Sequence, residues 1–402
     1  MAVRCGIDRL LEDGTVLAEL EGKRLAVLGH PASLTREGVH TLDALAGRGD
    51  LEVACAFGPQ HGMRGDKQDN MIESPDYVDP RLGIPVFSLY GEHRRPTQQM
   101  LDSFDVLLVD LQDIGTRIYT FVTTTCYMLE ACAEEGKPVW ILDRPNPAGR
   151  PAEGSILEPG WESMVGAGPL LMRHGLTLGE LTQWYAWKAG LDVELRVIPM
   201  TGYDPERPPG YGWPLAELPW VNPSPNASSL NMARCFPGTV LFEGTTLSEG
   251  RGTTTSLELV GAPDVDMTAV LRLMRETAPA WLEGCLIRPC YFEPTFHKHA
   301  GRLCSGLQIH TDTHLYRHES FRPYRIAALI LKAVRSLHPA YEIWRVFPYE
   351  YETERLAIDL LSGGPFLREW VDDPRSTPED LDARLIPDEE RWLKERSPFL
   401  IY

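Results

Sequence analysis

Long apolar segments are missing from this sequence. The 402-residue chain contains no run of about 18 apolar residues, and a helix that spans a membrane needs about 20. Residues 1–9 contain no apolar stretch that resembles a secretory signal. We therefore expect a soluble, cytoplasmic protein that has no membrane partner.

Cysteine pairs of the kind that bind zinc are also missing. None of the eight cysteines belongs to a Cys-x-x-Cys pair with a matching second pair, which argues against a zinc ribbon. His61 lies close in sequence to Asp66 and Asp69. His297 and His299 form a His-x-His pair. Neither group has the i, i+4 spacing of a zinc protease, so we expect no metal and no other cofactor.

Basic residues are scarce. The chain has 39 Lys and Arg residues against 57 Asp and Glu residues, and its formal net charge is -18. Such a surface argues against nucleic acid or an anionic membrane as the main partner. An anionic ligand would have to be bound by arginines at its own site, because the overall field repels it. We expect a small-molecule or oligosaccharide substrate and either a monomer or a homodimer.

Three common signatures of α/β enzymes are absent. The first expected strand is followed by Gly29-His30-Pro31-Ala32-Ser33 and not by a Gly-x-Gly-x-x-Gly turn. No Gly-Lys-[Ser/Thr] sequence of a P-loop occurs. A Gly-x-Ser-x-Gly nucleophile elbow is missing as well. These absences argue against NAD dependence and against a serine hydrolase of the α/β type.

Short β-rich runs alternate with segments of helical spacing in the first half of the chain. We expect strands at residues 25–29, 51–57, 84–89, 106–109, 139–142 and 194–198, and helices at 35–46, 97–102, 121–135 and 177–189. This alternation predicts a parallel sheet with helices on both faces. The following residues, 201–226, are rich in Pro, Gly and Trp and are expected to form an ordered loop or a linker.

The pattern changes beyond about residue 235. We expect strands at 239–242 and 307–310, helices at 267–277 and 323–337, and an acidic, helical tail. The sequence therefore predicts an α/β parallel-sheet domain over residues 1–235 and a smaller α+β domain over residues 236–402.

Polar residues follow each of the first five expected strands. They are His30, then Gln60 and His61, then Glu92, then Asp110, Gln112 and Asp113, then Asp143, Arg144 and Asn146. Any one of them can be explained as a helix cap or a turn residue. Ligands of open parallel sheets bind beyond the carboxyl ends of the strands, so the five groups together predict a site.

A glycine-rich segment of the second half adds two charged residues to the candidates. Residues 241–253 place Glu243 and Arg251 near each other, and their glycines permit close approach of the backbone to a ligand. The alternative is a capped turn with a surface salt bridge.

Several short motifs occur in a characteristic order. They are Pro59-Gln60-His61-Gly62, Ser88-Leu89-Tyr90-Gly91, Asp110-Leu111-Gln112-Asp113-Ile114-Gly115-Thr116-Arg117, Leu142-Asp143-Arg144-Pro145-Asn146-Pro147, His174-Gly175-Leu176-Thr177, Pro223-Ser224-Pro225-Asn226, Phe236-Pro237-Gly238-Thr239, Phe242-Glu243-Gly244-Thr245 and Gly250-Arg251-Gly252-Thr253. In these motifs the chain resembles the exo-β-N-acetylmuramidase family of the NamZ type. The resemblance implies a Rossmann-like catalytic domain, a smaller C-terminal domain and an active site in the cleft between them. It also implies a glycosidase that releases N-acetylmuramic acid from the non-reducing end of peptidoglycan fragments in cell-wall turnover and recycling.

The resemblance suggests how such a substrate would be held. A lactyl carboxylate suits a bidentate arginine, for which Arg64, Arg117, Arg144 and Arg251 are the candidates. Further substrate-binding candidates are Gln60, Gln112, Asp143, Asn146, His174 and Asn226. Trp213 or Trp220 is expected either to stack on the sugar or to belong to the core.

The chain departs from the family at one position of the first motif. That turn commonly reads Pro-Glu-His-Gly, and its Glu is a natural candidate for the acid, but this chain has Gln60. Glycoside hydrolysis usually needs two carboxyl groups, and an amide cannot shuttle a proton. The alternatives are an acid elsewhere, an essential Glu that was never at this position, another substrate, or no activity.

Several carboxyl groups are candidates for the missing acid. They are Asp110, Asp113, Glu243, Glu73 and Glu92. We expect Asp113, Glu243 and His61 to carry or orient proton transfer, with Asp110 as a further candidate. A sugar-binding protein that lost its acid and a metal-assisted hydrolase of another bond are the competing hypotheses.

Overall fold

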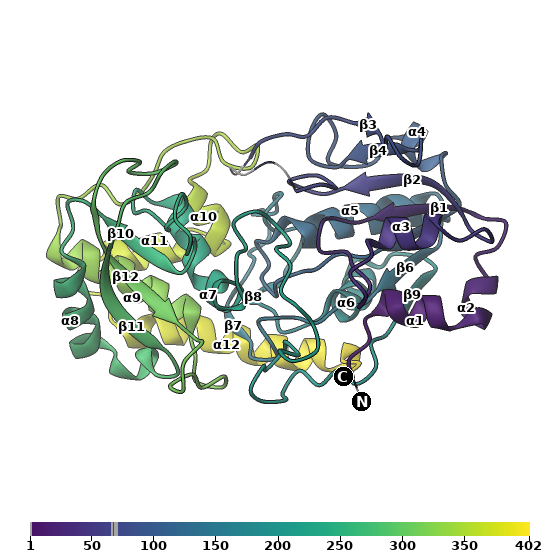
Figure 1. The fold of residues 1–402 in the computed structure, drawn as a ribbon. Coiled ribbons are helices and arrows are strands. Elements are labelled where there is room, and N and C mark those ends of the chain that lie inside the picture. The colour runs from purple at the N-terminus through teal and green to yellow at the C-terminus, as the bar shows by residue number, and fades with distance from the viewer. Residues whose placement is uncertain (1, 66, 68–70) are drawn as a thin grey trace.

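The computed structural model describes residues 2–65, 67 and 71–402. Its first part is built on a seven-stranded sheet in the order β3-β4-β2-β1-β5-β6-β9 (Figure 1). The strands are β1 (Arg24–Leu28), β2 (Glu52–Gly58), β3 (Tyr77–Val78), β4 (Pro85–Ser88), β5 (Val106–Val109), β6 (Val139–Leu142) and β9 (Leu195–Ile198). All neighbours are parallel except β3 and β4. The predicted α/β fold with a Rossmann-like sheet is therefore confirmed.

Helices cover both faces of this sheet. They are α1 (Gly6–Glu12), α2 (Gly14–Ala18), α3 (Thr41–Ala46), α4 (Gln98–Leu101), α5 (Thr120–Glu134) and α6 (Leu178–Ala189). In β5, Val106 and Leu108 pack with α1, α2 and α3, whereas Leu107 and Val109 pack with α4, α5 and α6. Successive side chains of a strand point to opposite faces, so a strand covered on both faces is apolar throughout. A capping box of Thr177 and Glu180 begins α6.

The second part combines helices with a small antiparallel sheet. It contains α7 (Leu230–Thr239), η1 (Val240–Gly244), β10 (Leu259–Ala262), α8 (Met267–Thr277), η2 (Pro279–Leu282), β11 (Leu286–Phe292), β12 (Cys304–His310), α9 (Pro323–Leu337), α10 (Ala357–Ser362), α11 (Phe366–Asp372), α12 (Pro378–Arg396) and η3 (Ser397–Phe399). The sheet has the order β10-β12-β11. A further hairpin, β7 (Glu153–Ile156) with β8 (Leu171–Arg173), lies between the two parts (Figure 1).

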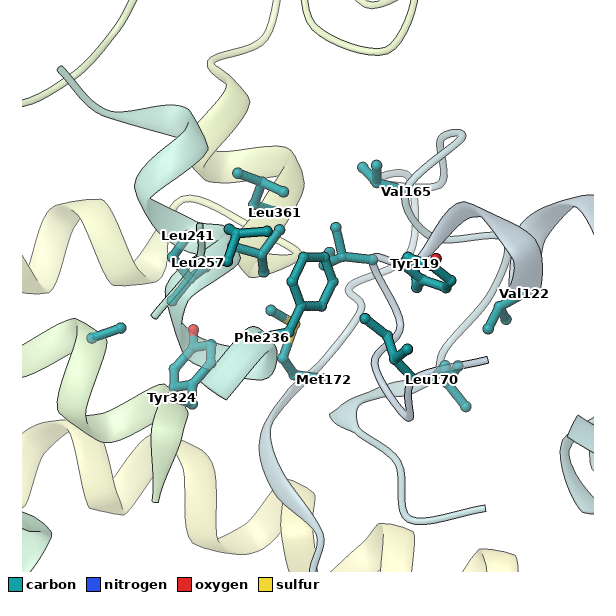
Figure 2. Packing of buried hydrophobic residues seen from close by; sticks show 14 of the residues in the cluster. Tyr119, Val122, Val165, Leu170, Met172, Phe236, Leu241, Leu257, Tyr324 and Leu361 are labelled. Carbon is teal, nitrogen blue, oxygen red and sulfur yellow. The ribbon is translucent and has the colours of Figure 1, made fainter. Parts of the chain in front are cut away.

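One hydrophobic core runs from the first part into the second. In Figure 2, Phe236 of α7 reaches toward Tyr119, and their rings lie 5.9 Å apart in an edge-to-face arrangement. The C-terminal helix α12 returns to the first part (Figure 1), where the Trp392 indole donates a hydrogen bond of 2.8 Å to the carbonyl of His174. The boundary expected between residues 235 and 236 falls inside α7, and the division at that point stays a prediction.

Two sequence-based expectations differ from the structure. The strand expected at 239–242 is wrong, because this segment forms the end of α7 and the 3-10 helix η1. Its β-branched residues favour a strand, but a short apolar run does not distinguish a strand from a buried helical turn, and here every residue of η1 is buried. The helix expected at 35–46 begins only at Thr41, where the His40 side chain accepts a hydrogen bond from the amide of Leu42.

The proline-rich segment forms an ordered loop, as predicted. The Trp213 and Trp220 rings pack edge to face at 5.0 Å, and each indole N–H donates to a backbone carbonyl of the same loop or its continuation. Both indoles therefore support the loop. No helix in the described part of the chain is long and apolar enough to cross a membrane.

Candidate active site

A polar pocket forms where six segments of the chain meet. They are the loop after β2, the start of α5, the loop between β7 and β8, the end of the proline-rich loop, the segment from α7 to the glycine turns after η1, and the loop before α10. Its polar lining residues are Gln60, His61, Tyr119, Thr120, Ser224, Asn226, Glu243, Arg251, Tyr349 and Glu350. We call it the inner pocket. Its volume is about 40 Å³, which is room for a few water molecules.

Glu350 is a buried carboxyl group in the wall of the inner pocket. Its Oε2 accepts a hydrogen bond of 2.7 Å from the Tyr90 hydroxyl, and its Oε1 accepts one of 3.2 Å from Nε2 of Gln60. Burial and, second to it, the nearby Glu243 raise the pKa of Glu350 to about 7, against the two hydrogen bonds and the positive charge of Arg251, which lower it. Glu350 therefore retains its proton to an unusually high pH for a carboxylic acid.

Glu243 is the second carboxyl group of the inner pocket, and its surroundings are different. It forms a buried salt bridge with Arg251 and accepts a hydrogen bond of 2.7 Å from the Tyr349 hydroxyl. The Arg251 guanidinium compensates the negative charge of this carboxylate. One pocket thus contains a carboxyl group with neutral donors and a carboxylate paired with a cation, which is the arrangement that acid–base chemistry requires.

Arg251 forms a second salt bridge, with the buried carboxylate of Glu249. Glu249 lies 3.1 Å from Nε of Arg251 and 2.6 Å from Nζ of Lys298. Burial works to raise the pKa of Glu249, but Lys298, His297 and Arg251 together hold it well below its usual range. Lys298 also donates to the carbonyls of residues 242, 245 and 247, so the same network fixes the turn that carries Glu243.

The loop after β2 presents Gln60 and His61 to the inner pocket. The Thr120 hydroxyl donates a hydrogen bond of 2.7 Å to Oε1 of Gln60, which directs the amide nitrogen toward Glu350. Nδ1 of His61 lies 2.8 Å from the carbonyl of Lys67. A carbonyl only accepts, so Nδ1 of His61 carries a proton and donates it to this hydrogen bond.

The backbone around the inner pocket is strained. His61, Leu257 and Glu350 have φ values of 68°, 61° and 47°, in the left-handed region that non-glycine residues rarely adopt. Such conformations cost roughly 1–3 kcal/mol each and cluster at functional sites. Their presence in three different segments of one pocket supports a functional role for it.

The other strand-end residues do not line this pocket. At the ends of β1, β5 and β6, the buried Asp110 forms a salt bridge with Arg144, with Nη2 and Oδ2 2.8 Å apart, and also accepts from the Thr41 hydroxyl. His30 joins them through Ser33. In an open α/β sheet the crevice at this point of reversed strand order commonly holds a ligand. Here a network of side chains occupies it.

We expect this network to be a major source of stability. Substitution Asp110→Ala leaves the buried Arg144 without its carboxylate, which should lower the free energy of unfolding by about 3–5 kcal/mol. Denaturant unfolding followed by circular dichroism measures the change. The matched control is Asp264→Ala, which breaks an exposed pair with Arg302 and should cost less than about 1 kcal/mol. Equal losses in the two variants would contradict the assignment.

The remaining candidates of the first half hold backbone segments together. Asp113 accepts from the amide of Gly115 and lies 3.4 Å from Nε2 of His174. Gln112 donates to two backbone carbonyls, and the buried Arg117 donates to three. Their hydrogen bonds make them parts of the scaffold around the pocket.

Two further strand-end candidates stabilise a helix start and a turn. Asp143 accepts from the Thr177 hydroxyl at 2.7 Å and from the amide of Gly179 at 2.8 Å, at the beginning of α6. Burial raises its pKa to about 6 in spite of these bonds. Asn146 donates to the carbonyl of Leu176 and accepts from the amide of Ala148.

The exposed candidates lie outside the inner pocket. Arg64 lies over the ring of Tyr77, Glu73 accepts a hydrogen bond of 3.2 Å from the Tyr351 hydroxyl, and Glu92 is exposed. Asp66 and Asp69 lie outside the described residues. Among the residues that the structure describes, no group of three or more His, Cys, Asp or Glu side chains is placed to hold a metal ion.

Sequence reasoning brought five candidates to the inner pocket and missed the most informative residue. Gln60, His61, Asn226, Glu243 and Arg251 meet there. Glu350 was missed because it follows none of the expected strands and belongs to none of the motifs. The one feature of the sequence that could have pointed to Glu350 as a candidate is its position between two tyrosines, in Tyr349-Glu350-Tyr351.

Known proteins match the chain over its whole length. The family model of the N-terminal part of exo-β-N-acetylmuramidase NamZ matches residues 25–231, and that of the C-terminal part matches residues 234–402. The peptidoglycan β-N-acetylmuramidase NamZ of Bacillus subtilis (strain 168) is 35% identical over 401 residues, covering 100% of this chain and 91% of that protein. Crystal structures of two DUF1343 family proteins of Bacteroides fragilis superpose with TM-scores of 0.86 and 0.75, at 28% and 26% identity. Each covers 100% of this chain and 99% of the other.

Proposed function

The chain belongs to the exo-β-N-acetylmuramidase NamZ family, and from this premise we propose that its inner pocket hydrolyses the glycosidic bond of a terminal N-acetylmuramic acid residue. The protein is a glycoside hydrolase that acts on peptidoglycan fragments. The observation that carries the assignment of the site is the pair of unlike carboxyl groups, Glu350 and Glu243, in one buried pocket.

Glu350 serves as the general acid. A pKa of about 7 keeps a large share of its carboxyl groups protonated near neutral pH, and a catalytic acid works best when its pKa lies near the operating pH. It passes its proton to the glycosidic oxygen while the bond to the anomeric carbon breaks, and water supplies the new hydroxyl group. Gln60, which occupies the family's usual Glu position, then has a supporting part, because its amide donates to the acid.

Glu243 supplies the negative charge that the electron-poor anomeric carbon needs. Its carboxylate is oriented by Arg251 and Tyr349, as expected of a group that acts as base or nucleophile. His61 and Asn226 line the pocket, where they would contact the hydroxyl and acetamido groups of the sugar. Arg251 is the lining residue whose positive charge a lactyl carboxylate would meet.

The inner pocket has to widen when substrate binds. A pyranose ring is larger than the few water molecules for which about 40 Å³ leaves room.

A direct test is the release of N-acetylmuramic acid from 4-nitrophenyl β-N-acetylmuramide. We expect steady release of nitrophenol, and none at high enzyme concentration would overturn the muramidase proposal. A signal that disappears with a chelator would instead favour a metal-assisted hydrolase.

The pH dependence should report the acid. Above pH of about 7 the proton of Glu350 is lost, so kcat/KM for a disaccharide substrate should fall as the pH rises through this value. In the variant Gln60→Glu a second carboxyl group replaces a hydrogen-bond donor beside Glu350, and like charges raise the pKa of such a pair. The alkaline limb should therefore move to higher pH, by about one pH unit.

The matched control for this shift is Gln99→Glu, an exposed site on the same part of the chain. It adds the same charge away from the acid and should leave the profile in place. An unchanged profile in Gln60→Glu would show that the alkaline limb does not belong to Glu350.

The cytoplasm is the location that fits best. All eight cysteines are free thiols in the structure, and six of them are buried. Unpaired cysteines are usual in a reducing compartment, where peptidoglycan fragments would be recycled.

A further inference from the structure

A second hollow adjoins the inner pocket on the outside of Glu350. It has a volume of about 420 Å³ and is open to solvent. Its walls are Glu92, His93, Arg94, Arg95, Tyr127, Met164, Glu350 and Tyr351. We call it the outer groove. Of the residues that line the two hollows, Glu350 is common to both.

Because Glu350 lies between the inner pocket and the outer groove, we expect the bond that is cleaved to lie at the boundary between these two hollows. A general acid protonates the oxygen between the sugar that is attacked and the group that leaves. With the terminal sugar in the inner pocket, the leaving group lies beyond Glu350, and the outer groove begins there. Its volume falls within the range typical of small-molecule sites.

Tyr351 presents an aromatic surface in the outer groove. The residue is 43% exposed, although large aromatic rings are usually covered. The Arg94 guanidinium lies 3.3 Å from the ring centroid, and the Tyr351 hydroxyl donates to Glu73. The ring of Tyr90 packs against it at 5.7 Å. These contacts hold an exposed ring in one orientation, and a pre-organised aromatic surface binds at low entropic cost.

The backbone supports the same interpretation. Glu350 and Tyr351 are consecutive residues with φ values of 47° and 71°. They are the two central residues of a tight turn in which Tyr349 and Glu352 exchange two backbone hydrogen bonds of 2.9 Å, and this type of turn requires a positive φ at both positions. Here the first residue lines both hollows and the second lines the outer groove.

We propose that the outer groove binds the leaving sugar of the substrate, an N-acetylated amino sugar, with the Tyr351 ring as its stacking surface. The inference rests on the proposed muramidase function. Arg94 and Arg95 place two guanidinium groups beside the tyrosine rings of the groove, with Arg95 lying 3.9 Å from the ring centroid of Tyr127. They offer donors to the hydroxyl and carbonyl groups of that sugar.

The test compares two substrates that share the muramyl residue. One is the disaccharide N-acetylmuramyl-β-1,4-N-acetylglucosamine, and the other is N-acetylmuramyl β-fluoride, whose leaving group does not fill the groove. In the variant Tyr351→Ala, we expect kcat/KM for the disaccharide to fall about tenfold through a higher KM, because the stacking surface is lost. Activity on the fluoride should stay within about twofold.

Two further measurements separate binding from an indirect effect on the neighbouring acid. If Tyr351→Ala misplaces Glu350, the alkaline limb of the pH profile moves, whereas loss of a stacking surface leaves the limb in place. Tyr351→Phe retains the ring and should restore the disaccharide KM. Tyr291→Ala, at a tyrosine that is 73% exposed on β11, is the matched control and should change neither substrate.

Each outcome has one meaning. Equal losses on both substrates, or no loss on either, would overturn the outer groove as the leaving-sugar site. A displaced alkaline limb would overturn it too and assign Tyr351 to positioning the acid. If the unaltered protein hydrolyses neither substrate, the muramidase function itself fails, and this result is distinct from the others.

Discussion

Glu350→Gln is expected to lower kcat for the muramyl disaccharide by roughly 10³-fold, in the middle of the range for loss of a general acid. The amide retains the size of the side chain but has no proton to give to the glycosidic oxygen. Loss on the β-fluoride should be much smaller, because fluoride leaves without protonation. The measurement is steady-state hydrolysis of both substrates, together with the pH profile of the remaining activity, which should lose its alkaline limb near pH 7.

The control for this variant is Glu354→Gln, an exposed residue of the same loop. It should retain full activity, and circular dichroism should show both variants folded. If Glu350→Gln retained more than about a tenth of the activity with its alkaline limb intact, another group would have to be the acid.

Glu243→Gln is expected to reduce kcat to a similar extent, by about 10²-fold to 10⁴-fold, on the disaccharide and on the fluoride alike. Both substrates require a negative charge or a base near the anomeric carbon, whatever their leaving group. Equal loss on the two substrates thus distinguishes the role of Glu243 from that of Glu350. Added azide should partly restore hydrolysis of the fluoride, and the anomer of the azide product would then report the face from which the carbon is attacked.

This variant also removes a buried charge from Arg251, so stability has to be measured beside activity. Arg251 still faces Glu249, which should limit the loss in the free energy of unfolding to less than the 3–5 kcal/mol of an uncompensated buried charge. Glu276→Gln, exposed on α8, is the control. Activity on the disaccharide within about tenfold of the unaltered protein would remove Glu243 from the reaction.

The rule that ligands bind beyond the strand ends pointed to one edge of the sheet, and most of the side chains that it singled out do not line the inner pocket. Polar residues do gather at the ends of β1, β5 and β6, but Asp110 and Arg144 pair with each other and Asp143 begins α6. The sequence does not distinguish a carboxylate that binds a substrate from one that forms a salt bridge with an arginine of the same protein. The loop after β2, with Gln60 and His61, and the end of the loop after β5, with Tyr119, continue from strand ends into the inner pocket.

The second half of the chain was harder to interpret from its residues. Glu243 and Arg251 were expected to lie near each other, and they form a buried salt bridge and not a surface one. The strand expected around them is a 3-10 helix, because packing of an apolar run decides its conformation when intrinsic preference is weak. Helices α8 and α9, whose apolar stripes are strongly periodic, begin and end where expected.

The sequence by itself determined the alternating α/β architecture, the family and the amide at position 60. Each of these depends on residues that are close together in the sequence, as a periodic pattern or a short motif, and not on contacts between distant segments. Only the tertiary structure pointed to Glu350 as the acid that we propose. Glu350 meets Gln60 across 290 positions of the chain, and its raised pKa comes from burial and from Glu243 in another segment. A pKa is a property of surroundings, and the surroundings of a buried group are assembled by folding.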